Sequence, residues 1–81
     1  MGYHTKQIPK GILGQISKIE EEFLELKDAF SQDNPILELC ECADLIGAIE
    51  AFVYQNYLID LADVIKMKNA TKRAFESGER K

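Results

Sequence analysis

Residues 36–54, with the sequence ILELCECADLIGAIEAFVY, decide the fold of this chain. Every residue of the stretch is apolar or glycine apart from four acids, which are Glu38, Glu41, Asp44 and Glu50. The stretch contains no Lys, Arg or His that could neutralise them. A carboxylate that is buried without a partner costs several kcal/mol or more. These acids must therefore face water, or a positive group must approach them.

The stretch is predicted to be a helix, because it is too long for an ordinary strand. Asn34-Pro35 precedes it, and Asn at the cap with Pro at the first position favours a helix start. A helical wheel predicts a broad buried apolar face and, beside it, a narrow strip where small residues flank Glu41 and Asp44. The apolar face consists of Leu39, Cys42, Leu45, Ile46, Ile49, Phe52 and Val53.

The whole chain of 81 residues is predicted to be one small all-α domain, residues 1–81. Ile16, Ile19, Phe23, Leu26 and Phe30 recur at spacings of three and four, which predicts a second amphipathic helix. A chain of this size buries a modest core, so we expect the bundle to be completed by oligomerisation. The expected elements are an N-terminal arm at 1–14, with a solvated His4, and helices at about 15–31, 35–55 and 58–76.

Composition excludes several classes of protein. The formal net charge of −4 argues against a general nucleic-acid binder. Four acids in the most apolar stretch argue against a membrane span. Cys40 and Cys42 lie two residues apart on one predicted helix and point to different faces, so they cannot form a disulfide with each other there. We therefore expect reduced, buried thiols and a cytoplasmic location.

Two acidic pairs are the candidate site. Glu22 and Glu25 lie three residues apart on the first helix, and Glu41 and Asp44 have the same spacing on the second. Residues three apart share a helical face, and a short turn makes consecutive helices antiparallel neighbours, so the pairs can face each other. Four carboxylates predict an oxygen-only site for Mg²⁺ or Mn²⁺. The neighbouring acids Glu20, Glu21 and Asp28 are predicted to be solvated.

Basic and amide side chains line one side of the third helix at steps of three and four, namely Lys66, Asn69 and Arg73. Cations near a helix C-terminus are often explained by the helix dipole alone. Alternatively, these cations could balance the acidic middle of the chain, residues 34–65, which has no basic residue. Lys18 is a further candidate, because it shares a helical line with Glu22.

The segments KIEEEFLELKDAF and ELCECADLIGAIE resemble the MazG-like group of all-α nucleoside triphosphate pyrophosphohydrolases. The signature of that group is Glu-x-x-Glu followed by Glu-x-x-Asp on the next helix, and Glu22, Glu25, Glu41 and Asp44 match it. The later segment DLADVIKMKNATKRAFESGER resembles the last helix of the group. The resemblance covers roughly residues 11–80 and is greatest to small phage and bacterial members, some of them phosphoribosyl-ATP pyrophosphohydrolase-like.

The resemblance implies a homodimer or homotetramer that cleaves a nucleoside triphosphate between its α and β phosphates with Mg²⁺. Glu22 or Glu25 would activate water, Lys66 and Arg73 would hold the polyphosphate, and Asn69 would contact sugar or base. Many relatives have four or more helices, so a complete site is expected to need a second subunit. Two alternatives stay open, an enzyme acting on phosphoribosyl-ATP or on one particular deoxynucleotide, and a non-catalytic helical interaction module.

Overall fold

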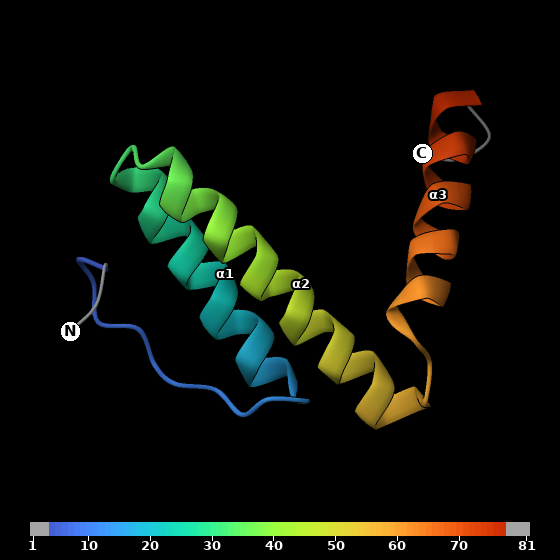
Figure 1. Ribbon diagram of the computed structural model, residues 1–81, viewed down its shortest axis with the longest axis horizontal. Helices are drawn as coiled ribbons and strands as arrows, with labels where there is room; N and C mark the ends of the chain where they lie inside the picture. The colour runs from blue at the N-terminus through green and yellow to red at the C-terminus, as the bar shows by residue number, and fades with distance from the viewer. Residues whose placement is uncertain (1–3, 78–81) are drawn as a thin grey trace.

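The computed structural model describes residues 4–77, including all side chains in that range except those of residues 74, 75 and 77. The described residues form three α-helices and no strand, which confirms the all-α prediction. Figure 1 shows α1 and α2 side by side and antiparallel, with α3 set apart from the pair. None of these helices is long and apolar enough to cross a membrane. The helices are α1 (Ile16–Ser31), α2 (Pro35–Tyr57) and α3 (Leu61–Ser77).

Local signals fix the turn between α1 and α2. Asp33 has a positive φ of 55°, which ends α1 and reverses the chain. Asn34 then caps α2, because its side-chain oxygen accepts a hydrogen bond from the amide of Leu37 at 3.2 Å. Pro35 occupies the first turn, where its missing N–H removes no helical bond. The Asn-Pro signal thus starts the helix where the sequence predicted.

The end of α2 lies two residues later than expected. Residues 55–57, predicted to be a turn, are the last residues of α2. Leu58, predicted to begin the third helix, instead adopts a left-handed conformation with a φ of 57° and ends α2. The connection therefore moves to residues 58–60, and α3 begins at Leu61.

The packing between α1 and α2 is not the one that a hydrophobic wheel predicts. At their contact the helices bury Ala29 and Ala48, which are 0% and 2% exposed. Small side chains allow the two helices to approach closely, and they bring the polar strip of α2 against α1. The apolar stripes therefore lie toward solvent in the single chain, with Phe23 50% and Leu39 71% exposed. One chain covers the apolar face of α2 only in part, with Leu45, Ile49, Phe52 and Val53 half-buried, and the expectation that oligomerisation completes its burial stays a prediction.

The orientation of α2, with its polar strip against α1, also exposes the two thiols. Cys40 and Cys42, expected to be buried, are both exposed and free. Among the described residues, α3 comes close to α2 but not to α1. One chain therefore leaves apolar surface on all three helices, including Ile46 on α2 and Met67 on α3, which are 52% and 63% exposed.

The N-terminal arm runs back along α1 (Figure 1). The amide of Gly11 donates to Glu21 at 2.8 Å, and the amide of Ile12 donates to the hydroxyl of Ser17 at 3.0 Å. Any Cβ at Gly11 would overlap the backbone of Ser17, so this close approach requires glycine. The side chain of Asn56 on α2 donates to the carbonyl of Gly14 at 3.1 Å. Hydrogen bonds to both helices thus fix the path of the arm.

Candidate functional site

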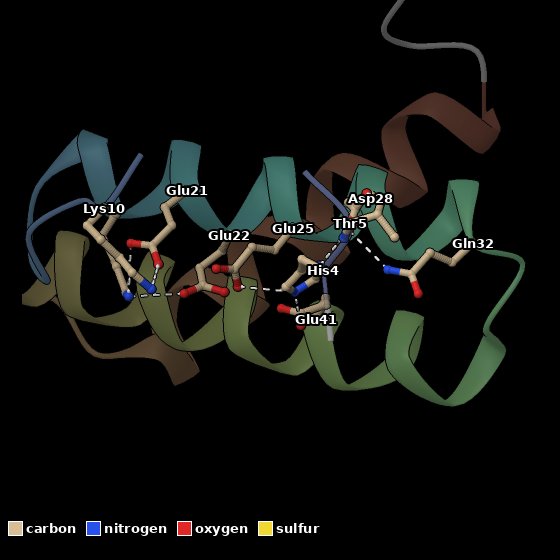
Figure 2. Close-up of polar contacts among 10 residues, drawn as sticks. His4, Thr5, Lys10, Glu21, Glu22, Glu25, Asp28, Gln32 and Glu41 are labelled. Carbon is tan, nitrogen blue, oxygen red and sulfur yellow. Dashed lines mark hydrogen bonds and ion pairs between the residues drawn. The ribbon is translucent and has the colours of Figure 1, made fainter. Parts of the chain in front are cut away.

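Acidic side chains from α1 and α2 gather at the contact between the two helices. Figure 2 shows them in a row along the pair, with residues of the N-terminal arm lying over them. Four of these acids are nearly inaccessible to solvent, with Glu21 3%, Glu22 6%, Asp28 1% and Glu41 5% exposed. The core of the α1–α2 pair is therefore acidic rather than apolar.

The structure brings together the four carboxylates that the sequence selected. Oxygens of Glu22, Glu41 and Asp44 all lie within 4.8 Å of one another, close enough to share one cation. Glu25 joins Glu22 and Glu21 in a second group of the same size. Glu22 and Glu41 are buried, Glu25 is half-buried, and Asp44 is exposed at the edge. One side of the set is therefore open to solvent, as a site that takes up a ligand requires.

Two oxygens in this set have no partner. Oε1 of Glu22 and Oε1 of Glu41 are buried and accept no hydrogen bond from any described residue. A buried oxygen without a partner costs about 1–3 kcal/mol, and more when the group is charged. Both residues belong to the acidic set, so the fold leaves one unpartnered acceptor on each helix that a cation could satisfy.

The pKa of Glu25 reflects the close approach of several negatively charged side chains. Its pKa is raised from 4.5 to about 7, first by burial and then by the nearby carboxylates of Glu22 and Glu41. Like charges in close contact favour a shared proton or a bound cation. A carboxylate with a pKa near neutrality is also suited to exchange protons with water. This property favours Glu25 as the residue that activates water, a choice that the sequence left open.

Glu21 is buried with partners, contrary to the prediction that it is solvated. It accepts from the Gly11 amide at 2.8 Å and from Lys18 at 3.2 Å, and Lys10 lies 3.7 Å away. Burial alone would raise its pKa, but the Gly11 and Lys18 hydrogen bonds outweigh it and hold the pKa below the usual value. Glu21 therefore anchors the arm. Glu20, also predicted to be solvated, is exposed.

Lys18 lies at the end of the acidic set that is nearest the start of α1. Its Nζ is 3.2 Å from Glu22 Oε2 and 3.2 Å from Glu21 Oε1. The hydrogen bond to Glu22 is the main reason why the pKa of Lys18 is raised. Its helical line with Glu22 predicted this proximity, and Lys18 holds a positive charge beside the carboxylates.

His4 was not selected from the sequence, and the prediction that it is solvated is wrong. Its Nδ1 is 3.0 Å from Asp28 Oδ2, and its Nε2 is 3.0 Å from Glu41 Oε2 and 3.8 Å from Glu25 Oε1. Burial lowers its pKa, but the hydrogen bonds to Asp28 and Glu41 outweigh burial and raise it above 6.5. Separations of 24 and 37 residues explain why no short-range spacing revealed these contacts.

Asp28, likewise predicted to be solvated, has the most complete set of hydrogen bonds in the described structure. It accepts from the hydroxyl of Thr5 at 2.6 Å, the amide of Thr5 at 2.8 Å and the Gln32 side chain at 3.0 Å, in addition to His4. The Thr5 hydroxyl contributes most to lowering its pKa to about 2. Asp28 thus fixes the start of the arm over the acidic set.

The predicted basic strip of α3 does not meet the carboxylates within one chain. Lys66, Asn69 and Arg73 are all exposed, and α3 does not approach α1. Neither Lys66 nor Arg73 forms an ion pair with any residue that the structure describes. If these residues act at the carboxylates, they must do so through α3 of another chain.

Comparison of the sequence with models of protein families, with curated proteins and with solved structures finds no match.

Proposed function

We propose that this protein is an Mg²⁺-dependent nucleoside triphosphate pyrophosphohydrolase, which cleaves a (d)NTP to the monophosphate and pyrophosphate. One observation carries the proposal: two helices place four carboxylates together, and two of the buried oxygens among them have no partner. The resemblance of the two acidic motifs to the MazG-like enzymes supports the same reaction.

The donor set fits a hard divalent cation. Glu22, Glu25, Glu41 and Asp44 supply only carboxylate oxygens, which Mg²⁺ and Mn²⁺ prefer. The unpartnered oxygens of Glu22 and Glu41 would become ligands, and the repulsion that raises the pKa of Glu25 would fall. When bound, the cation would neutralise phosphate charge and lower the pKa of a coordinated water.

Residues of the chain would have three roles around that water: accepting its proton, stabilising the phosphate charge and holding the cation. Glu25 would accept the proton of the attacking water, because its carboxylate lies beside those of Glu22 and Glu41, which would hold the cation. Lys18, held 3.2 Å from Glu22, would stabilise negative charge on the phosphates. Glu41 and Asp44 would hold the cation opposite α1, so that both helices contribute to one site.

The proposal includes a second subunit. The apolar stripe of α1 and the apolar face of α2 are exposed in one chain, for instance at Phe30 and Leu39, which are 73% and 71% exposed. Packing two chains along these faces would cover them and could bring a partner α3 toward the carboxylates. Lys66, Asn69 and Arg73 of that helix would then contact the nucleotide across the interface.

The test is pyrophosphate release from a panel of ribo- and deoxynucleoside triphosphates with Mg²⁺. Glu41→Gln should reduce the rate at least hundredfold and remove the Mg²⁺-dependent rise in melting temperature. Glu20→Gln is the matched control, because it makes the same chemical change on the exposed side of α1. Orthophosphate as the first product would refute cleavage between the α and β phosphates.

Complementation tests the shared site. Arg73→Ala should lower turnover about tenfold to hundredfold, as expected for the loss of a charged hydrogen bond. Mixing Arg73→Ala and Glu41→Gln chains should restore roughly one quarter of the wild-type rate, because half of the dimers are mixed and each holds one intact site. If both residues act within one chain, mixing restores nothing.

An interaction module is the second candidate, and the groove between α2 and α3 favours it. Ile46, Ile49, Leu61, Val64, Ile65 and Lys68 line this groove, which is almost entirely apolar. Turnover of no nucleotide, together with no effect of Mg²⁺ on stability, would support this candidate over the enzyme.

A further inference from the structure

His4 is the one nitrogen donor that the described structure places among the candidate metal-binding carboxylates. Its side chain comes from the N-terminal arm and contacts the acidic set at Glu41 (Figure 2). Together with Glu25 and Glu41 it forms a group in which one potential ligand atom of each residue lies within 4.8 Å of the others. The carboxylates of this group belong to the proposed site, but the imidazole has no role in that proposal.

Asp28 determines which nitrogen of His4 faces the acids. Asp28 Oδ2 is 3.0 Å from Nδ1, and the carboxylate is only 1% exposed. Because both oxygens of Asp28 already accept hydrogen bonds, from Thr5 and Gln32, Asp28 is placed to accept from Nδ1 as well. Nδ1 therefore carries a proton, and Nε2 is the nitrogen that points at Glu41 and Glu25.

This arrangement is the one that proteins use to orient a metal-bound histidine. A ligating imidazole typically donates its other N–H to a carboxylate or carbonyl, which fixes the tautomer and increases the basicity of the ligating nitrogen. Asp28 has that position here, and Thr5 and Gln32 hold Asp28 in turn. The arm is thereby fixed independently of any group that binds between the helices.

The carboxylates of the site supply a second indication of a ligand. Oε1 of Glu41 and Oε1 of Glu22 are buried without partners, on side chains 5% and 6% exposed. Nε2 lies 3.0 Å from the other oxygen of Glu41. In the tautomer with the proton on Nδ1, Nε2 and this carboxylate oxygen are both acceptors, and a cation can lie between them and bind to both. A proton on Nε2 takes that place in the absence of a cation.

We propose that His4 is a ligand of the divalent cation through Nε2, so that the site contains nitrogen as well as oxygen donors. This inference rests on the cation site of the proposed function. On binding, a bond from Nε2 to the cation replaces the hydrogen bond to Glu41, and the proton passes to solvent. An imidazole ligand favours Mn²⁺, Co²⁺ or Zn²⁺ relative to Mg²⁺, which prefers oxygen alone.

The test uses the fact that His4 is the only histidine of the chain. The full chain, expressed without a histidine tag and labelled with ¹⁵N-histidine, gives one imidazole signal pair in a long-range ¹H–¹⁵N spectrum. Addition of diamagnetic Zn²⁺ should shift Nε2 into the range of metal-bound nitrogen and leave the proton on Nδ1. This measurement needs no variant, so it does not depend on whether a substitution disturbs the arm.

Calorimetry of the same protein measures how much His4 contributes. His4→Ala should weaken Mn²⁺ binding about tenfold to hundredfold and Mg²⁺ binding less. Gln7→Ala is the matched control, because Gln7 is a neutral, exposed residue of the same arm, and its affinities should equal those of the wild type.

Three results would overturn the proposal. Zn²⁺ binding with an unshifted Nε2 would do so while leaving the carboxylate site standing. Tighter Mn²⁺ binding by His4→Ala would mean that the imidazole occupies the place of the cation instead of binding it. Absence of any divalent-cation binding would remove the proposed function along with this inference.

Discussion

Substitution of Phe30 tests whether the exposed apolar stripe of α1 is a subunit interface. Phe30 is the most exposed aromatic side chain of the described structure, at 73%. A Phe side chain buries roughly 200 Å² when fully covered, so a partner could remove roughly 150 Å² of apolar surface from water at this residue alone. At about 25 cal/mol per Å², complete coverage would contribute about 4 kcal/mol per subunit.

Phe30→Ser should therefore dissociate the oligomer without unfolding the chain. If a partner covers only half of the exposed surface, the loss is about 2 kcal/mol per subunit and about 4 kcal/mol for a symmetric dimer. That loss corresponds to a roughly thousandfold higher dissociation constant, and so to weaker association. The free energy of unfolding of the monomer should change little, because Ser and Phe have similar helix propensities and the ring is exposed.

Sedimentation equilibrium over nanomolar to micromolar concentrations measures the dissociation constant, and urea unfolding of dilute protein measures the monomer. An unchanged dissociation constant in Phe30→Ser would exclude this stripe from the interface. A wild-type chain that stays monomeric at every concentration would refute the oligomer altogether, and with it the route that brings the basic residues of α3 to the carboxylates.

Three further predictions follow from individual contacts. Because the pKa of Glu25 is raised from 4.5 to about 7, the folded metal-free protein retains a proton that the unfolded chain releases. Its unfolding free energy should therefore fall as pH rises from 4.5 to about 7, and Glu25→Gln should flatten this slope in urea titrations. Asp44→Asn should abolish pyrophosphate release yet leave metal-free stability equal or slightly higher, because it removes a like charge; a large loss of stability would show that Asp44 is structural. Asn34→Ala should destabilise the chain by about 1 kcal/mol, since the Leu37 amide loses its cap, and no change in the denaturation midpoint would contradict that role.

The acidic motifs of the sequence predicted the helical part of the site because of their spacing. Residues three apart on a helix share a face whatever the helix packs against, so the positions of Glu22 relative to Glu25, and of Glu41 relative to Asp44, follow from helical geometry. The short turn at Asp33-Asn34 made the two pairs neighbours, and the structure places them together. Local geometry was sufficient to place the two members of each pair on one face, whereas the packing of α1 against α2 set the pairs against each other.

The sequence determined that the chain is helical and roughly where its helices begin, since periodicity and the Asn34-Pro35 cap act over a few residues. It could not decide which faces pack together. Ala29 and Ala48 let α1 and α2 approach through their acidic strips, and the larger apolar side chains lie outside the contact. Nor could it place His4, because the contact with Glu41 spans 37 residues and exists only once the arm has docked on both helices. Spacing along a helix is a local property, whereas the choice of packing face and the path of the arm depend on contacts between segments that only the tertiary structure brings together.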